Sequence, residues 1–201
     1  MSMRFLNMRE LSHVRRNHLA KQACIGKGSF ASVFAPSVES RTVSKVTTDI
    51  CSYHLLADGV WHLTRADVEV HFPRLVENHG EVGESRGLTA YLVEVERLYP
   101  VSTTEHRRRI DGWANEYEAL HRSTFVHHNL DERFHLASRE FCKRLAARED
   151  EPYRKVFEAM HDFLRDYGGA LDLKRSNFMC RSDGTLVWND VVFDVKTYTR
   201  H

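Results

Sequence analysis

The stretch "LDLKRSNFMCRSDGTLVWND", residues 171–190, places Asp172, Asn177 and Asp190 at defined intervals. Asp172 and Asn177 are separated by four residues, and Asp190 lies thirteen residues beyond Asn177, just after the β-rich run "TLVW". Carboxylate and amide oxygens are the ligands that Mg²⁺ prefers in proteins. A loop followed by a hairpin would bring these side chains to one magnesium site, and Asp183-Gly184 is a strong signal for a two-residue hairpin turn.

The residues before this stretch have the pattern of helices. Residues 103–166 are charged and helical in spacing, with breaks near "STFVHHNLDERF" and "REDEP". Pro152 suits the first turn of the last helix in this region, and Gly168 and Gly169 end that helix.

The first half of the chain has the pattern of strands instead. "KQACIGKGSFASVFAP", residues 21–36, predicts two short strands joined by a glycine turn, and "RTVSKVTT" predicts a third. Residues 47–65 have helical spacing, with Thr48 or Asp49 as the N-cap, and residues 71–100 predict two more strands. We therefore expect an α+β fold, in which residues 1–98 form a small antiparallel sheet lobe with an N-terminal helix. Residues 99–201 form a reduced helical lobe.

In this order the motifs resemble those of protein kinases. "LDLKRSN" is similar to the catalytic loop H-R-D-L-K-x-x-N, which implies Asp172 as the base, Lys174 beside the γ-phosphate and Asn177 on the metal. "NDV" at 189–191 stands where D-F-G would stand, which implies that Asp190 is a metal ligand. The resemblance implies ATP and Mg²⁺ as cofactors and a two-lobed protein-kinase-like fold.

The glycine turn resembles the kinase loop G-x-G-x-x-G-x-V that covers the phosphates of ATP. Ala31 replaces the third glycine of that pattern. A glycine turn alone is more often a plain hairpin, so the inference depends on the joint spacing of the motifs. The loop residues implied to bind nucleotide are Gly26, Lys27, Gly28, Ser29, Phe30 and Val33.

Two further segments complete the nucleotide site that the resemblance implies. "TVSK" is similar to the strand that carries the phosphate-binding lysine, which gives Lys45 that role. "LVEVERL" is similar to the linker between kinase lobes, where backbone groups from Glu96 to Leu98 would meet adenine. Asp58, on the predicted helix, is our candidate for the acidic partner of Lys45.

A closer resemblance is to the early serine/threonine kinases of T-odd bacteriophages. Their last motif reads F-D-x-H-x-G-N-I-M, then I-T-D-P-V-x-F, and this chain has "LDLKRSNFM" and "VWNDVVFD" in the same register. The similarity covers roughly residues 20–198 and is thin outside the motifs. That family phosphorylates host transcription and RNA-processing proteins, which implies host proteins as substrates and the host cytoplasm as the location.

Parts of the kinase pattern are absent from the sequence. Ala170 and Leu171 replace the His and Arg of the catalytic loop, and loss of that Arg removes the usual partner of an activation-loop phosphate. Eleven residues follow Asp190, too few for an activation segment, an A-P-E motif and the helices of a peptide platform. We therefore expect that substrates dock on another surface or that the chain has lost substrate phosphorylation.

Three functions remain open on these residues. The first is an ATP- and magnesium-dependent protein kinase acting on Ser or Thr. The second is a kinase-shaped protein that binds and inhibits a host factor without catalysis; the missing platform favours it, and the retained Lys45 and Asp190 disfavour it. The third is a small-molecule phosphotransferase of the antibiotic-kinase type. Such enzymes usually have His where this chain has Lys174, and they carry a larger helical lobe.

The composition argues against several other classes. Hydrophobic residues make up 42% and charged residues 28%, with a formal net charge of +1, so no strong field would recruit nucleic acid or an anionic membrane. No apolar run is long enough to span a bilayer, and the N-terminus lacks the pattern of a signal peptide. We expect a cytoplasmic protein with no membrane or nucleic-acid partner.

Scattered cysteines and histidines do not have metal-site spacing. No C-x-x-C pair occurs, and His127 and His128 beside His121 predict a solvated or packed cluster rather than a zinc site. The residues predicted to be free thiols in a reducing compartment are Cys24, Cys51, Cys142 and Cys180.

Overall fold

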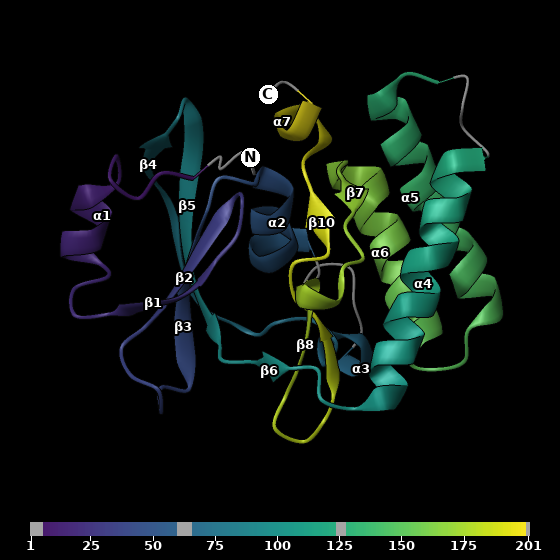
Figure 1. The fold of residues 1–201 in the computed structure, drawn as a ribbon, viewed down its shortest axis with the longest axis horizontal. Helices are drawn as coiled ribbons and strands as arrows, with labels where there is room; N and C mark the ends of the chain where they lie inside the picture. Colours follow the sequence, from purple (N-terminus) through teal and green to yellow (C-terminus); the bar gives the residue numbers. More distant parts are fainter. Residues whose placement is uncertain (1–5, 60–65, 124–127, 200–201) are drawn as a thin grey trace.

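The computed structural model describes residues 6–59, 66–123 and 128–199. It has an α+β fold with an antiparallel five-stranded sheet at one end and helices α4, α5 and α6 at the other (Figure 1). Two small sheets, β10-β7 and β6-β8-β9, lie between these two parts (Figure 1).

The five-stranded sheet has the order β1-β2-β3-β5-β4, with every neighbouring pair antiparallel. Its strands are β1 (Ala23–Lys27), β2 (Ala31–Ala35), β3 (Thr42–Thr47), β4 (Leu75–Ser85) and β5 (Leu88–Glu96). These strands confirm the predicted glycine hairpin, the third strand and the two later strands.

The two faces of this sheet have different coverings, because successive side chains of a strand point to opposite faces. Phe34, Val46 and Leu92 pack with Val14 of α1 (Ser12–Asn17). On the other face, Val43, Val93 and Val95 pack with Leu56, which follows helix α2. Lys45 shares the parity of Val43, and it is therefore directed to the α2 side of the sheet.

Helix α2 (Ile50–His54) follows β3 directly and begins at the cap Asp49, whose side chain accepts the Ser52 amide. Of the two predicted caps, the structure therefore selects Asp49. The helical path does not continue as one regular element, because a π-helical turn follows at Leu55–Gly59. Residues 60–65 of the predicted helix lie outside the described residues, and a short helix α3 (Ala66–Glu69) comes next.

The helical part confirms the predicted breaks in residues 103–166. Its helices are α4 (Thr104–Ser123), α5 (Leu130–Arg148) and α6 (Tyr153–Tyr167). Asn129 caps α5 through the Glu132 amide. Gly168 and Gly169 follow α6 with φ angles of 77° and 85°, which ends the helix as expected.

Short strands position the C-terminal segment. Strand β7 (Ala170–Leu171) pairs with β10 (Val192–Phe193), and a 3₁₀ turn spans Arg175–Asn177. The other small sheet contains β6 (Tyr99–Pro100), β8 (Phe178–Cys180) and β9 (Leu186–Trp188), and α7 (Val195–Thr199) ends the described chain.

The predicted two-residue turn at Asp183-Gly184 is wrong in its length. Strands β8 and β9 are joined by residues 181–185, in which the Arg181 amide donates to the Thr185 carbonyl at 3.0 Å. The Arg181 side chain leaves the hairpin and donates to the carbonyl oxygens of Val70 and Phe72. These two hydrogen bonds tie the β8–β9 hairpin to the segment before β4.

The largest core cluster joins residues from both halves of the sequence. Cys51, Leu55, Val68 and Phe72 belong to the cluster that contains the buried faces of α4, α5 and α6. All four cysteines of the chain are free thiols, as predicted. None of the helices in the described part of the chain is long and apolar enough to cross a membrane.

Candidate functional site

Two adjoining cavities lie between the five-stranded sheet and the C-terminal segment. The larger has a volume of about 570 Å³ and the smaller about 340 Å³. The residues that line both cavities are Gly28, Ala31, Ser176, Asn177 and Asp190. Three of these five are residues for which the sequence predicted a role in binding nucleotide or metal.

At this junction Lys45 contacts the C-terminal segment across 145 residues of sequence. Its ammonium nitrogen lies 2.8 Å from Asp190 Oδ1 and donates to Ser52 Oγ at 2.9 Å. The Ser52 hydroxyl in turn donates to Asp190 Oδ1 at 2.8 Å. Lys45 is buried, whereas the Asp190 side chain is 39% exposed and borders both cavities.

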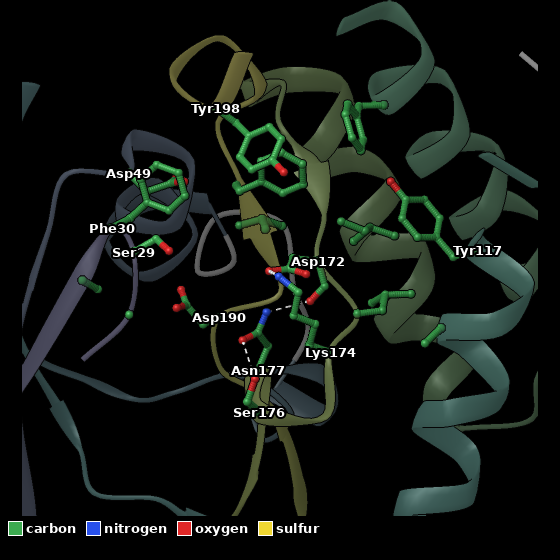
Figure 2. Close-up of a pocket in the computed structure, with 18 of the residues that line it drawn as sticks. Ser29, Phe30, Asp49, Tyr117, Asp172, Lys174, Ser176, Asn177, Asp190 and Tyr198 are labelled. Carbon is green, nitrogen blue, oxygen red and sulfur yellow. Dashed lines mark hydrogen bonds and ion pairs between the residues drawn. The ribbon is translucent and has the colours of Figure 1, made fainter. Parts of the chain in front are cut away.

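The loop from Asp172 to Asn177 is fixed to the segment that carries Asp190. The Asp172 amide donates to the Val191 carbonyl at 2.8 Å, next to the β7–β10 pair. Asn177 Nδ2 donates to the Asp172 carbonyl at 2.8 Å, and the Asn177 carbonyl accepts the Asp190 amide at 3.0 Å. Figure 2 shows Asn177 between Asp190 on one side and Asp172 with Lys174 on the other.

Lys174 lies at the solvent side of this loop. Its ammonium nitrogen is 3.0 Å from Asp172 Oδ2, and the two side chains are 72% and 30% exposed. Solvent screens a pair this exposed, so it contributes little to stability. The structure thus brings Asp172, Lys174, Asn177 and Asp190 to the lining of the larger cavity.

The glycine hairpin β1–β2 forms the sheet side of both cavities. Gly28, Ser29 and Phe30 line the larger cavity, and Gly26, Lys27 and Val33 line the smaller one. An added Cβ would meet nothing closer than 3.8 Å at Gly28 and 3.6 Å at Gly26. The protein's own packing therefore does not require glycine at either position.

The smaller cavity has aliphatic walls. Side chains on the sheet side include Val33, Val43 and Val95, and Met179 of β8 lies on the opposite side. Residues 96–98 also line this cavity. The Glu96 amide donates to the Arg74 carbonyl at 3.0 Å, and the Arg97 amide donates to the Arg41 carbonyl at 2.8 Å. The Glu96 carboxylate pairs with Arg181, so that side chain joins the sheet to the β8–β9 hairpin.

The far end of the larger cavity is aromatic. Phe134 of α5, Phe193 of β10 and Tyr198 of α7 contact one another, with ring centroids 5.4 to 6.3 Å apart. Tyr198 is half exposed. Tyr117 of α4 also lines this cavity (Figure 2). Its hydroxyl lies 2.9 Å from Ser138 Oγ, and burial raises the pKa of Tyr117.

Asp49 is a buried carboxylate at the edge of the larger cavity. One oxygen accepts the Ser52 amide at 2.8 Å, and the other accepts the Asp194 amide at 3.0 Å. Burial raises its pKa to about 7 against these hydrogen bonds, and the charges of Asp190 and Asp194 act in the same direction as burial. Asp49 therefore ties α2 to the C-terminal segment.

The expected partner of Lys45 was wrong. Asp58 pairs instead with His54, one helical turn away, at 2.7 Å. Ser52 and Asp190 are the side-chain partners of Lys45, and the sequence did not single out Ser52. A serine in the first turn of a helix gives no sequence signal for such a role.

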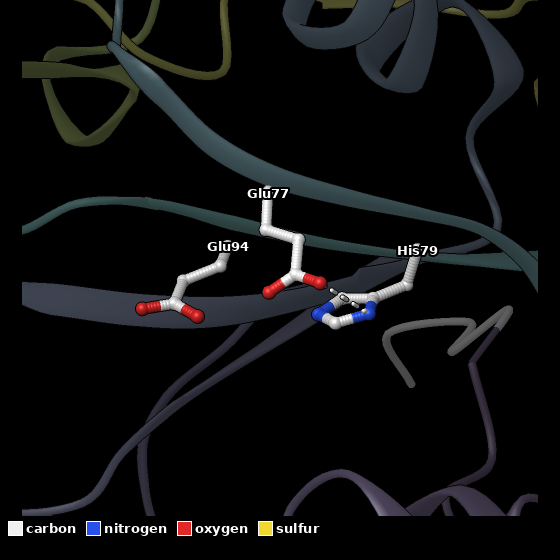
Figure 3. Close-up of side chains that lie close together, drawn as sticks. All are labelled: Glu77, His79 and Glu94. Carbon is white, nitrogen blue, oxygen red and sulfur yellow. Dashed lines mark ion pairs between the residues drawn. The ribbon is translucent and has the colours of Figure 1, made fainter.

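A separate group of possible metal ligands lies on β4 and β5. Glu77, His79 and Glu94 have ligand atoms within 4.8 Å of one another (Figure 3). Glu94 also accepts a hydrogen bond from Thr42, and His79 packs against the His18 ring. These residues do not line the two cavities, and local contacts account for their arrangement.

The described histidines of the predicted group do not form a compact cluster of ligands, since His121 lies on α4 and His128 lies just before α5. His121 stacks on Phe134 with ring centroids 4.5 Å apart, and His128 lies 3.3 Å from Glu132. His127 lies outside the described residues.

No protein-family model and no curated protein matches this chain.

Proposed function

We propose that the protein is an ATP- and Mg²⁺-dependent phosphotransferase that transfers the γ-phosphoryl group to a Ser or Thr hydroxyl of a protein. One observation carries the proposal: Lys45 of β3, the loop with Asp172 and Asn177, and Asp190 come together around the two adjoining cavities. Phosphoryl transfer needs such a set of cations, metal-binding oxygens and a hydroxyl-orienting group. The order of these four residues along the chain supports a protein-kinase-like fold.

The smaller cavity would hold the nucleoside. Its aliphatic walls suit the two faces of a planar base, with Val33 and Val43 on one side and Met179 on the other. Because the Glu96 and Arg97 amides already have backbone partners, we assign the hydrogen bond to adenine to the Leu98 backbone.

The glycine hairpin and Lys45 would hold the phosphates. Gly26 and Gly28 are not required by the packing of the protein, and the absence of a Cβ lets a phosphate approach the backbone closely. Lys45 lies behind the hairpin, and its ammonium group contacts Asp190, which lines both cavities. Magnesium bound there would neutralise charge on the phosphates.

Asn177 and Asp190 would hold the magnesium ion. Asn177 Nδ2 is committed to the Asp172 carbonyl, so the amide oxygen is the atom of that side chain that would bind the ion. Ser176 Oγ donates to this oxygen at 3.4 Å, and the second lone pair of the oxygen could face the metal. Both hydrogen bonds found for the Asp190 carboxylate go to Oδ1, so Oδ2 has no partner among the described residues. Two such oxygen ligands fit the coordination that Mg²⁺ prefers.

Asp172 and Lys174 would act on the acceptor side. Asp172 would accept or orient the proton of the substrate hydroxyl, and Lys174 would neutralise charge on the transferring phosphoryl group. The acceptor would enter past the aromatic end formed by Phe134, Phe193 and Tyr198. The resemblance to phage kinases suggests host proteins as acceptors and the host cytoplasm as the site of action.

A small-molecule phosphotransferase is the second candidate. The larger cavity has the volume of a site for a drug-sized ligand, and α7 places Tyr198 on its lining. Such a site could enclose a whole acceptor molecule rather than one side chain of a protein.

Nucleotide binding tests the part of the proposal that both candidates share. Mg²⁺-ATP should raise the melting temperature of the wild-type protein, because a ligand that binds only the folded state stabilises it. Lys45→Met should reduce that rise. Lys143→Met, which changes an exposed lysine of α5, should leave it unchanged. No rise at millimolar Mg²⁺-ATP would exclude both phosphotransferase candidates.

A further inference from the structure

The Ser52 hydroxyl lies between the two oppositely charged groups at the junction of the cavities. Ser52 Oγ is 2.9 Å from the Lys45 ammonium nitrogen and 2.8 Å from Asp190 Oδ1. Lys45 and Asp190 are themselves 2.8 Å apart, so the three groups are all in direct contact. Ser52 is only 2% exposed, and solvent does not replace its hydrogen bonds.

A hydroxyl is suited to this place because it donates one hydrogen bond and accepts others at the same time. An ammonium group only donates, and an ionised carboxylate only accepts. The Ser52 proton therefore points to Asp190, and its lone pair faces Lys45. A carboxylate at the same position would accept from Lys45 but would repel Asp190.

The backbone around Ser52 fixes the hydroxyl in this position. The Ser52 amide donates to Asp49 Oδ1 at 2.8 Å in the first turn of α2. The other Asp49 oxygen accepts the Asp194 amide at 3.0 Å, four residues after Asp190. The first turn of α2 therefore contacts the C-terminal segment through two residues.

We infer that Ser52 is a positioning residue for phosphoryl transfer, which orients the Asp190 carboxylate and the Lys45 ammonium group through one hydroxyl. This inference rests on the proposed function. With Lys45, the hydroxyl holds Asp190 Oδ1, so that Oδ2 is presented to the magnesium ion. Ser52 does not line either cavity, and it would act through its two partners without touching nucleotide.

The test separates phosphate and metal binding from binding of the base. Ser52→Ala should raise the Mg²⁺ concentration needed for half-maximal activity and should lower kcat by about tenfold or more, the size expected for loss of a hydrogen bond to a charged group. Binding of adenosine, which lacks phosphates, should stay at the wild-type level by calorimetry. Ser44→Ala, a change at another buried serine beside Lys45, is the matched control.

Two further variants define the role of the hydroxyl. Ser52→Thr keeps a donor and an acceptor and should restore most of the activity. Ser52→Asp keeps an acceptor for Lys45 but repels Asp190, and it should remain as impaired as Ser52→Ala. Wild-type Mg²⁺ dependence in Ser52→Ala, or full activity in Ser52→Asp, would overturn the inference.

A measurement without nucleotide keeps this inference distinct from the proposed function. Urea unfolding of Ser52→Ala, Asp190→Asn and the double variant gives a double-mutant cycle. The two changes should be non-additive, because Ser52→Ala removes the hydrogen bond to Asp190 and Asp190→Asn removes the charge that strengthens the same bond. Additive shifts of the unfolding midpoint would contradict the coupling even if the protein binds ATP. Failure of the wild-type protein to bind Mg²⁺-ATP would remove the proposed function and with it the catalytic role of Ser52.

Discussion

The two cavities share the polar residues Ser176, Asn177 and Asp190, which we call the shared floor, but they differ in their other lining residues. The smaller cavity has aliphatic side chains and the backbone of residues 96–98, whereas the larger one has Asp172 and Lys174 beside an aromatic end. Asn177 and Asp190 belong to both. Under the proposed function, the smaller cavity would hold the nucleoside and the reacting groups would lie on the side of the larger one. Substitutions should therefore separate binding from chemistry according to the cavity that they change.

The largest effect is expected at the shared floor. Asp190→Asn keeps the size of the side chain but removes the charge that Lys45 contacts and that Mg²⁺ would need. Turnover should fall by about 100- to 1,000-fold, the range for loss of one preorganised electrostatic group. Transfer of labelled phosphate measures the effect, and circular dichroism checks the fold.

Asp150→Asn is the control for this prediction, because Asp150 is exposed between α5 and α6. It should retain full turnover. If Asp190→Asn retained near-wild-type transfer, Asp190 could not be the metal ligand, and the assignment of the shared floor would be wrong.

A smaller effect is expected at the aromatic end of the larger cavity. Tyr198→Ala removes a half-exposed ring that contacts Phe193 and Phe134. The KM for the acceptor should rise by about tenfold, since burial of an aromatic side chain against a ligand contributes on the order of 1–3 kcal/mol. The KM for ATP should not change, because Tyr198 does not line the smaller cavity. Equal changes in both KM values would show that the two cavities do not divide the substrates as proposed.

The smallest effect concerns Asp49 and the pH dependence of stability. Its pKa is raised from 3.8 to about 7 in the folded protein. Between pH 4 and 7 the folded state keeps a proton that the unfolded state has lost, so the free energy of unfolding should decrease as pH rises. The slope from one such group is at most about 1.4 kcal/mol per pH unit.

Asp49→Asn should remove this part of the pH dependence. Urea unfolding of both proteins at pH 5 and pH 7.5 measures the difference, and the wild-type protein should lose more stability over that interval. Parallel pH dependence of the two proteins would mean that Asp49 titrates in the ordinary carboxyl range.

The sequence predicted the parts of the fold that local signals specify. The glycine hairpin, strand β3 and the breaks between α4, α5 and α6 follow from turn residues and hydrophobic spacing. The spacing of Asp172 and Asn177 placed both in one loop, and the structure connects them by a hydrogen bond from Asn177 Nδ2. Strands of two residues, such as β6 and β7, have too few side chains to show a period.

The contacts that complete the site depend on tertiary structure and have no local signal. Ser52 and Asp190 are 138 residues apart, and only the folded chain brings their side chains together. The acidic residue that the sequence offered, Asp58, lies after the π-helical turn begins and pairs with His54 instead. In the same way, the bonds from the Arg181 side chain to carbonyl groups before β4 join segments that are far apart in the sequence.

The proposed transfer of the γ-phosphoryl group is tested most directly with labelled ATP. Transfer of the label by the wild-type protein and by Asp172→Ala is measured, each with Mg²⁺ or with excess EDTA. ATP labelled at the γ-phosphate is incubated with a cell extract, and ATP labelled at the α-phosphate controls for binding alone. We expect that only the γ-label reaches an acceptor and that EDTA stops the transfer. Asp172→Ala should bind Mg²⁺-ATP but should transfer the label at least about 100-fold more slowly. Equal transfer by Asp172→Ala, or no transfer of γ-label by a wild-type protein that binds Mg²⁺-ATP, would contradict the proposal.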